Sequence, residues 1–262
     1  HSIIPCPDDD CLLGHSDNAV ILKAVKAWME KYRVRAYDEN IHKGTVRHIL
    51  IRTGFHTDEI MLCLVTKKML RKEAADGLVD VVKELNGEIS GRNSGIHLHI
   101  TSLVVNINKE DTNVILGKEC VTLYGKPYIE DYIGDIKFQI SPLSFFQVNP
   151  KQTEVLYNKA LEFANLTGNE AVWDLYCGIG TISLFLAKNA GMVYGVEIVP
   201  QAIEDAKNNA GINGIDNAEF FVGKAEEVVT AFYESRKADD GTGHNMTRPD
   251  VIVVDPPRKG CD

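Results

Sequence analysis

The sequence predicts an α/β protein. A doubly wound, mainly parallel sheet is expected in residues 141–262, preceded by an α+β domain in residues 1–140. After Pro150, short apolar segments of strand length alternate with segments of helical periodicity, which is typical of successive βαβ units. Before Pro150, strand-like segments follow one another with only two helical segments among them.

The first domain is expected to hold two amphipathic helices and an antiparallel sheet. Apolar residues recur at helical spacing over 17–33, where Asp17 could cap the helix, and over 72–87. Strand-like segments separated by turn residues are 46–53, 59–66, 96–105, 113–124 and 136–141.

The second domain is expected to begin with a helix and then to alternate strands with helices. The expected helices are 151–165, 180–190, 200–210 and 225–233. The expected strands are 170–175, 192–197, 218–222 and 250–255. The polar stretch 234–249 predicts a surface loop before the fourth strand.

Composition places the chain among globular proteins, with 44% hydrophobic and 25% charged residues. No apolar run approaches the ~20 residues that cross a bilayer. The six cysteines are scattered, and with no secretory leader they favour a cytoplasmic, reducing compartment. The net charge is −9, so any basic surface for a nucleic acid must be local.

A glycine-containing turn follows the strand expected at 170–175. The segment Asp174 to Thr181 (DLYCGIGT) opens a helix, and Gly178 and Gly180 allow a tight turn and close approach of a ligand. The amide groups at the start of that helix face the same space. Such a turn alone also fits an ordinary strand–helix connection.

An acidic residue ends the next expected strand. Glu197 lies 23 residues after Asp174, where a carboxylate accepts hydrogen bonds from both hydroxyls of a ribose. The third glycine of the pyrophosphate-binding pattern is replaced by Ser183. This favours S-adenosylmethionine, which has a ribose but no phosphate, over a nicotinamide cofactor.

Two further motifs flank this pattern. Asp255 begins DPPRKG at the end of the fourth strand, where paired prolines make a stiff loop beside the ligand crevice. Arg258 in that motif makes methylation of exocyclic amines the weaker interpretation. Upstream, SFFQVNP (144–150) predicts either a lid over the cofactor or, for Phe145 and Phe146, core packing.

Together, SFFQVNP, DLYCGIGTISL and DPPRKG resemble the RNA uracil-carbon-5 methyltransferases, which make 5-methyluridine in bacterial 23S ribosomal RNA and in tRNA. VRHILIRTG and NVILGKECVTLYGKPYI resemble that family's central domain, so the likeness covers most of the chain. The form DLYCGIGT and a cysteine near the start are more similar to the ribosomal branch. The resemblance therefore implies a Rossmann-like methyltransferase domain behind an RNA-facing central domain.

The resemblance also implies roles for individual residues. The cofactor-binding set comprises Gln147, Tyr176, Glu197 and Asp255, with Thr181, Asp174, Gly178 and Gly180 from the glycine turn. Lys224 stands where a polar or acidic residue often reaches the adenine. The residues implied to face RNA are Arg47, His48, Arg52 and Arg258.

In this family a cysteine thiolate adds to carbon-6 of uracil, which activates carbon-5, and a base later removes the carbon-5 proton. The target base must leave its stack. Neither Cys177 nor Cys261 matches the family's nucleophile, so the nucleophile and the base are expected beyond Asp262 and the chain alone is expected to be inactive. Cys11, or alternatively Cys6, resembles the fourth ligand of a [4Fe–4S] cluster whose other ligands this chain lacks.

Three functions remain open from the sequence. The first is 5-methyluridine formation in 23S ribosomal RNA. The second is another RNA methyltransferase, acting on tRNA or forming 5-methylcytosine. The third is a non-catalytic RNA-binding module with a vestigial cofactor pocket, which the intact Gly178, Gly180, Glu197 and Asp255 disfavour.

Overall fold

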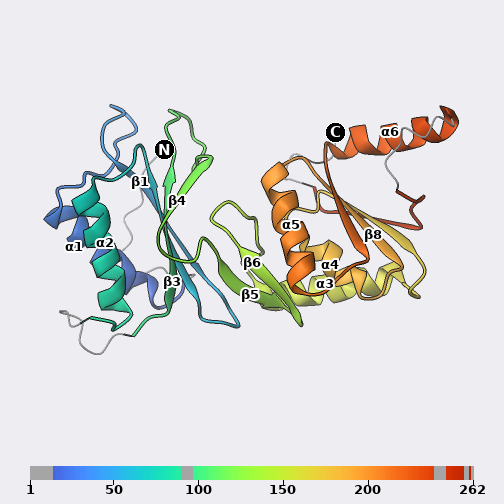
Figure 1. Cartoon of the computed structure of the whole chain (residues 1–262), viewed down its shortest axis with the longest axis horizontal. Helices are drawn as coiled ribbons and strands as arrows, with labels where there is room; N and C mark the ends of the chain where they lie inside the picture. The colour runs from blue at the N-terminus through green and yellow to red at the C-terminus, as the bar shows by residue number, and fades with distance from the viewer. Residues whose placement is uncertain (1–13, 90–96, 239–245, 257–259, 261–262) are drawn as a thin grey trace. The chain divides into compact units, whose positions relative to one another are not determined.

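A computed structural model describes residues 14–89, 97–238, 246–256 and 260. The chain forms two compact units (Figure 1). The first comprises His1–Glu130 and Ser141–Leu143, and the second comprises Asp131–Ile140 and Ser144–Asp262. No helix among the described residues has the length and apolar character needed to cross a membrane.

The first unit contains a four-stranded sheet in the order β1-β2-β3-β4. The strands are β1 (Val46–Thr53), β2 (Ile60–Thr66), β3 (Ile100–Ile107) and β4 (Glu119–Gly125). The prediction of an antiparallel sheet was wrong at its centre, because β2 and β3 are parallel. Helix α2 (Lys72–Leu85) connects these two strands and so returns the chain to the same end of the sheet.

Helices α1 (Asn18–Lys31) and α2 share one hydrophobic core with this sheet (Figure 1). Trp28 on α1 is buried in this core, and its indole N–H donates to the carbonyl of Ala74, 2.8 Å away. Asp17 is the N-cap residue of α1 as expected, but its side chain makes no capping hydrogen bond.

The second unit contains a parallel sheet in the order β10-β7-β8-β9. Its strands are β7 (Ala171–Leu175), β8 (Met192–Glu197), β9 (Ala218–Val222) and β10 (Val251–Val254). Its helices are α3 (Pro150–Ala164), α4 (Thr181–Ala187), α5 (Pro200–Ile212) and α6 (Ala225–Ala238). The doubly wound α/β prediction is confirmed, and the strand ends on one edge of the sheet become available for a ligand.

The hairpin of β5 (Ile129–Ile133) and β6 (Ile136–Ile140) lies directly before the expected domain boundary at residue 140, but the observed boundary falls within β5, after Glu130. Residues 131–140, expected in the first domain, group with the second unit. The reason is the amide side chains of α5: Asn209 Oδ1 accepts from the Gln139 N–H and Asn213 Oδ1 from the Lys137 N–H, each at 2.9 Å. Strand β5 was not predicted from the sequence.

Candidate cofactor site

A cleft of about 770 Å³ opens where strands β7, β8, β9 and β10 end in the second unit. Its lining comes from the turns after these strands, from the segment before α3 and from the start of α6. It contains seven of the eight residues predicted to bind the cofactor, namely Gln147, Asp174, Tyr176, Gly178, Thr181, Glu197 and Asp255. The structure therefore brings these residues together at one edge of a parallel sheet.

The turn after β7 has the backbone that its glycines predicted. Gly178 has φ +55° with no atom within 4 Å of the position of a Cβ, so its backbone is open to the cleft. Gly180, the eighth predicted residue, has φ +83° and packs near Phe220 and Ala206 instead. Tyr176 also has positive φ, +73°, which is strained for a residue with a side chain. The turn thus holds backbone groups against the cleft at a conformational cost.

Glu197 ends β8 with its carboxylate held by backbone donors. The N–H of Gly178 donates to Oε2 at 3.2 Å, and the N–H of Val199 donates to Oε1 at 3.0 Å. Each carboxylate oxygen has two lone pairs, so acceptor capacity remains for a ligand. The carboxylate is thereby fixed in orientation beside the glycine turn.

Asp174 lies completely buried at the base of the cleft. Ser183 donates its hydroxyl proton to Oδ2 at 2.6 Å, whereas Oδ1 has no hydrogen-bond partner in the described structure. Burial, together with smaller contributions from the nearby carboxylates of Asp255 and Glu197, raises the pKa of Asp174 to about 6. A buried acceptor without a partner is costly, so this oxygen is suited to receive a donor from a ligand.

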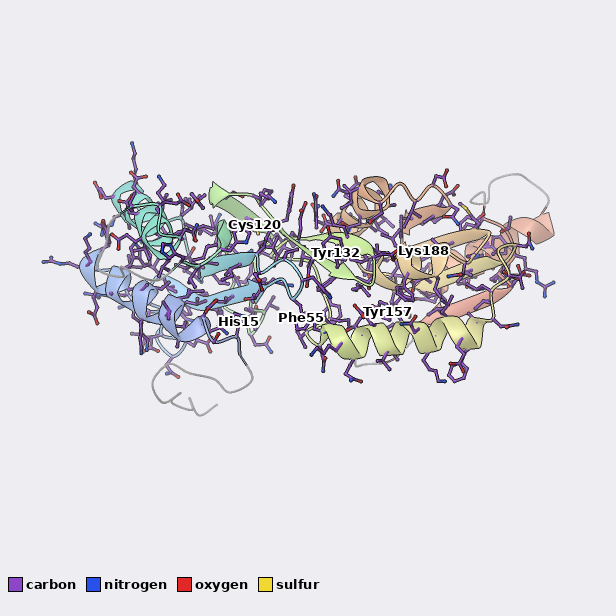
Figure 2. The ribbon with its side chains drawn as sticks, turned by 90° about the horizontal axis from the view of Figure 1, so that it is seen from below. His15, Phe55, Cys120, Tyr132, Tyr157 and Lys188 are labelled. Carbon is purple, nitrogen blue, oxygen red and sulfur yellow. The ribbon has the colours of Figure 1, made fainter. Side chains whose placement is uncertain are left out.

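Tyr157 was missed by the sequence analysis because it lies inside a helix of ordinary periodicity. It projects from α3 (Figure 2) and is 1% exposed. Its hydroxyl lies 2.8 Å from Thr181 Oγ1 and also hydrogen-bonds Gln147. Burial raises the pKa of Tyr157 to about 12, so the phenol stays protonated. Through these hydrogen bonds Tyr157 positions Thr181 and Gln147, which both line the cleft.

The segment before α3 combines the two alternatives that its sequence left open. Phe145 lines the cleft and is 70% exposed, whereas Phe146 packs against Phe138 of β6 with ring centroids 5.8 Å apart. Asn149 caps α3, because its side chain accepts from the N–H of Gln152 at 3.3 Å. The helix therefore starts at a defined place and holds the cleft-facing segment.

The start of α6 adds one cation and one further carboxylate to the cleft. Lys224 and Glu226 both line it, and Lys224 Nζ lies 2.8 Å from Oε1 of Glu227. Cys177 also lines the cleft but is 5% exposed, and burial holds the pKa of its thiol well above the ordinary value. This protonated thiol is consistent with the prediction that Cys177 is not a nucleophile.

Gly195 in β8 makes room for the glycine turn. A Cβ at this position would lie 2.5 Å from the ring of Phe220 and 2.9 Å from Sγ of Cys177. We expect Gly195→Ala to lower the free energy of unfolding by about 1–3 kcal/mol through overpacking, measured by urea denaturation. Gly211→Ala in α5, where nothing lies within 4 Å, is the control and should stabilise by about 0.5–1 kcal/mol. Equal effects of the two substitutions would contradict this account.

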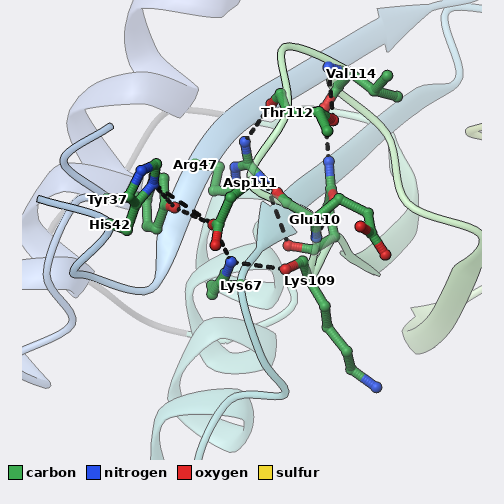
Figure 3. A network of polar contacts seen from close by, with 10 residues as sticks. Tyr37, His42, Arg47, Lys67, Lys109, Glu110, Asp111, Thr112 and Val114 are labelled. Carbon is green, nitrogen blue, oxygen red and sulfur yellow. Dashed lines mark hydrogen bonds and ion pairs between the residues drawn. The ribbon is translucent and has the colours of Figure 1, made fainter. Parts of the chain in front are cut away.

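Arg47, predicted to face RNA, is engaged within the first unit (Figure 3). Its guanidinium donates to the backbone carbonyls of Asn108, Glu110 and Thr112, and it lies over the ring of Tyr37 at 4.8 Å. These contacts hold the loop between β3 and β4, and few donors are left for a phosphate. A role for Arg47 in RNA binding stays a prediction.

Asp111 secures the same loop from its other side (Figure 3). Its carboxylate accepts from Lys67 and from the hydroxyl of Tyr37, and Nδ1 of His42 lies 3.5 Å away. The hydrogen bond from Lys67 is the largest cause of the lowered pKa of Asp111. The charged residues at this end of the sheet therefore support loop structure.

Of the other residues predicted to face RNA, two are half-buried and one lies outside the described residues. Arg52 is half-buried and donates to the carbonyl of Pro142 at 3.3 Å. His48 is half-buried too, and burial followed by the charge of Arg47 lowers its pKa, which keeps the ring neutral at pH 7. Arg258 lies outside the described residues.

No group of three or more metal-ligating side chains occurs among the described residues. Cys63 and Cys120 lie in strands β2 and β4, as expected, and burial raises the pKa of Cys63 to about 12. Cys6, Cys11 and Cys261 lie outside the described residues. The iron–sulfur prediction therefore stays a prediction.

The parallel sheet, the glycine turn and the acidic end of β8 define the Rossmann-like methyltransferase class. The structure of Pyrococcus abyssi tRNA (uracil-54, C5)-methyltransferase in complex with S-adenosyl-L-homocysteine is similar, with a TM-score of 0.72 and 24% identity. The alignment covers 100% of this chain and 56% of that one, and it supports the fold.

The sequence profile described as tRNA (Uracil-5-)-methyltransferase matches residues 55–262. An uncharacterized RNA methyltransferase of Clostridium tetani is 48% identical over 100% of this chain, and one of Halalkalibacterium halodurans is 49% identical over 97%. The chain belongs to the tRNA (uracil-5-)-methyltransferase family. It spans 52% and 51% of the length of these two relatives.

Proposed function

We propose that this chain carries the S-adenosylmethionine site of an RNA 5-methyluridine methyltransferase. The observation that carries the proposal is the cleft in which a fixed carboxylate, a strained glycine turn and a buried acceptor without a partner converge. These features fit the cofactor. The carboxylate of Glu197 suits a ribose diol, the open backbone at Gly178 suits close approach, and Oδ1 of Asp174 suits an ammonium donor.

The chain's own residues bind and orient in this proposal. Glu197 holds the ribose, while Gln147 and Thr181 are kept in place by Tyr157. Tyr176 and Asp255 line the part of the cleft between the ends of β7 and β10, which are neighbouring strands. When bound, the cofactor supplies an electrophilic methyl group on a sulfonium. The nucleophilic cysteine and the base of the whole enzyme remain proposed to lie beyond Asp262.

We propose 23S ribosomal RNA, in the cytoplasm, as the substrate of the whole protein. The support is the likeness of the glycine-turn motif and the early cysteine to the ribosomal branch. tRNA is the second candidate, because the matching family is described as tRNA (uracil-5-)-methyltransferase and the similar P. abyssi enzyme is a tRNA methyltransferase. The residues proposed to face RNA are His48, Arg52 and Arg258, with Arg47 restricted by its own contacts.

Two measurements test this proposal. Calorimetric titration of the chain with S-adenosylmethionine should show saturable binding, and absence of heat and of any thermal shift would remove the cofactor assignment. The full-length protein should then transfer a radiolabelled methyl group to 23S ribosomal RNA, with 5-methyluridine identified by mass spectrometry. Labelling of tRNA transcripts alone would replace the ribosomal substrate by tRNA.

A further inference from the structure

The cleft is strongly anionic. Four carboxylate side chains line it, those of Asp174, Glu197, Glu226 and Asp255. Lys224 is the only cation among the described lining residues. The charge of Lys224 is offset in turn by Glu227, which lies outside the lining at 2.8 Å from its ammonium. A ligand in this cleft therefore meets an excess of negative charge.

The fold keeps this charge in place. Backbone N–H groups of Gly178 and Val199 hold the carboxylate of Glu197. Glu226 lies in the first turn of α6, where the helix dipole stabilises a carboxylate. Asp174 is fully buried, and its Oδ1 has no partner in the described structure. This unpartnered oxygen is an independent sign that the acidic cluster receives a ligand with a hydrogen-bond donor, as the ammonium of the cofactor is.

The two cofactor forms of a methyl transfer differ by one charge. S-adenosylmethionine has a net positive charge at neutral pH, because its sulfonium and ammonium outweigh its carboxylate. S-adenosylhomocysteine has the same ribose and adenine but no sulfonium, and its net charge is zero. Because opposite charges attract over several ångströms, an anionic cleft distinguishes the two forms even without direct contact with the sulfur.

We propose that this cleft binds the cationic methyl donor more tightly than the neutral product, and that Glu226 is one residue that sets this preference. The inference rests on the proposed cofactor. Glu197 holds the ribose that both forms contain, so its loss weakens both. Glu226 makes no hydrogen bond or ion pair with another described residue, so it acts through its charge. The consequence is easier release of the product after each turnover.

The test is calorimetric titration of the full chain with three ligands. They are S-adenosylmethionine, S-adenosylhomocysteine and sinefungin, which has an ammonium in place of the sulfonium. At low salt we expect the two cationic ligands to bind about threefold to tenfold more tightly than the neutral one. The ratio should shrink as salt shortens the screening length.

Variants locate the effect. Glu226→Gln should weaken the two cationic ligands about threefold or more and leave S-adenosylhomocysteine nearly unchanged. Glu219→Gln is the matched control, because Glu219 is exposed on β9 and outside the cleft lining. It should change none of the three affinities.

The outcomes separate this inference from the proposed function. If none of the ligands binds, the proposed cofactor itself fails. If all three bind with equal affinity, or if S-adenosylhomocysteine binds most tightly at low salt, the charge preference is wrong. If the preference exists but Glu226→Gln leaves it intact, Glu226 has no part in it.

Discussion

Replacing Glu197 by glutamine is expected to weaken binding of both S-adenosylmethionine and S-adenosylhomocysteine by about tenfold to a hundredfold. The carboxylate accepts from the N–H groups of Gly178 and Val199 and retains lone pairs for the two hydroxyls of a ribose. A glutamine has one carbonyl oxygen, so it cannot serve these donors together. A hydrogen bond to a charged group contributes about 1.5–3 kcal/mol, which corresponds to that loss of affinity.

Calorimetry with both ligands measures this loss, and Glu204→Gln on the exposed surface of α5 is the control. Both ligands should weaken, because both contain the ribose, and S-adenosylmethionine should weaken somewhat more, because one of the cleft carboxylates is lost. A loss confined to the cationic ligand would assign Glu197 to charge recognition instead of ribose recognition. Unchanged affinity for both would remove Glu197 from the cofactor site.

The glycine turn and the end of β8 were predictable because their chemistry is local. Gly178 and Gly180 have the positive φ values that their position after a strand implied, and Glu197 ends the next strand. Parallel neighbouring strands place both features at the same sheet edge. Most of the geometry of this side of the cleft could therefore be predicted from the pattern of residue types.

Other features depend on contacts between distant segments. The parallel pairing of β2 with β3 follows from the return through α2, which strand periodicity alone does not show. Tyr157 reaches Thr181 across 24 positions of sequence, and nothing in its helix distinguishes it from a core residue. Arg47 has the charge that suits a phosphate, but the loop after β3 captures its guanidinium. These three arrangements could be identified only from the three-dimensional structure.

Asp174→Asn should make the protein more stable while it weakens cofactor binding more than tenfold. Burial raises the pKa of Asp174 from 3.8 to about 6, so the folded state disfavours the carboxylate at neutral pH. A difference of about two pKa units corresponds to ~3 kcal/mol, and the neutral amide avoids this cost. The same substitution removes the anion that a ligand ammonium would meet at Oδ1, which has no partner in the described structure.

The pH dependence of stability identifies the carboxylate as the cause. Between pH 3.8 and about 6 the unfolded Asp174 is ionised while the folded one keeps its proton, so this residue makes stability fall as pH rises. The gain from Asp174→Asn should be absent near pH 4, grow up to about pH 6 and stay constant above it. Urea denaturation of both proteins across this range measures it, with exposed Asp216→Asn as the control. A gain independent of pH would assign the effect to packing, since the charge contributes only above the pH at which the unfolded carboxylate ionises.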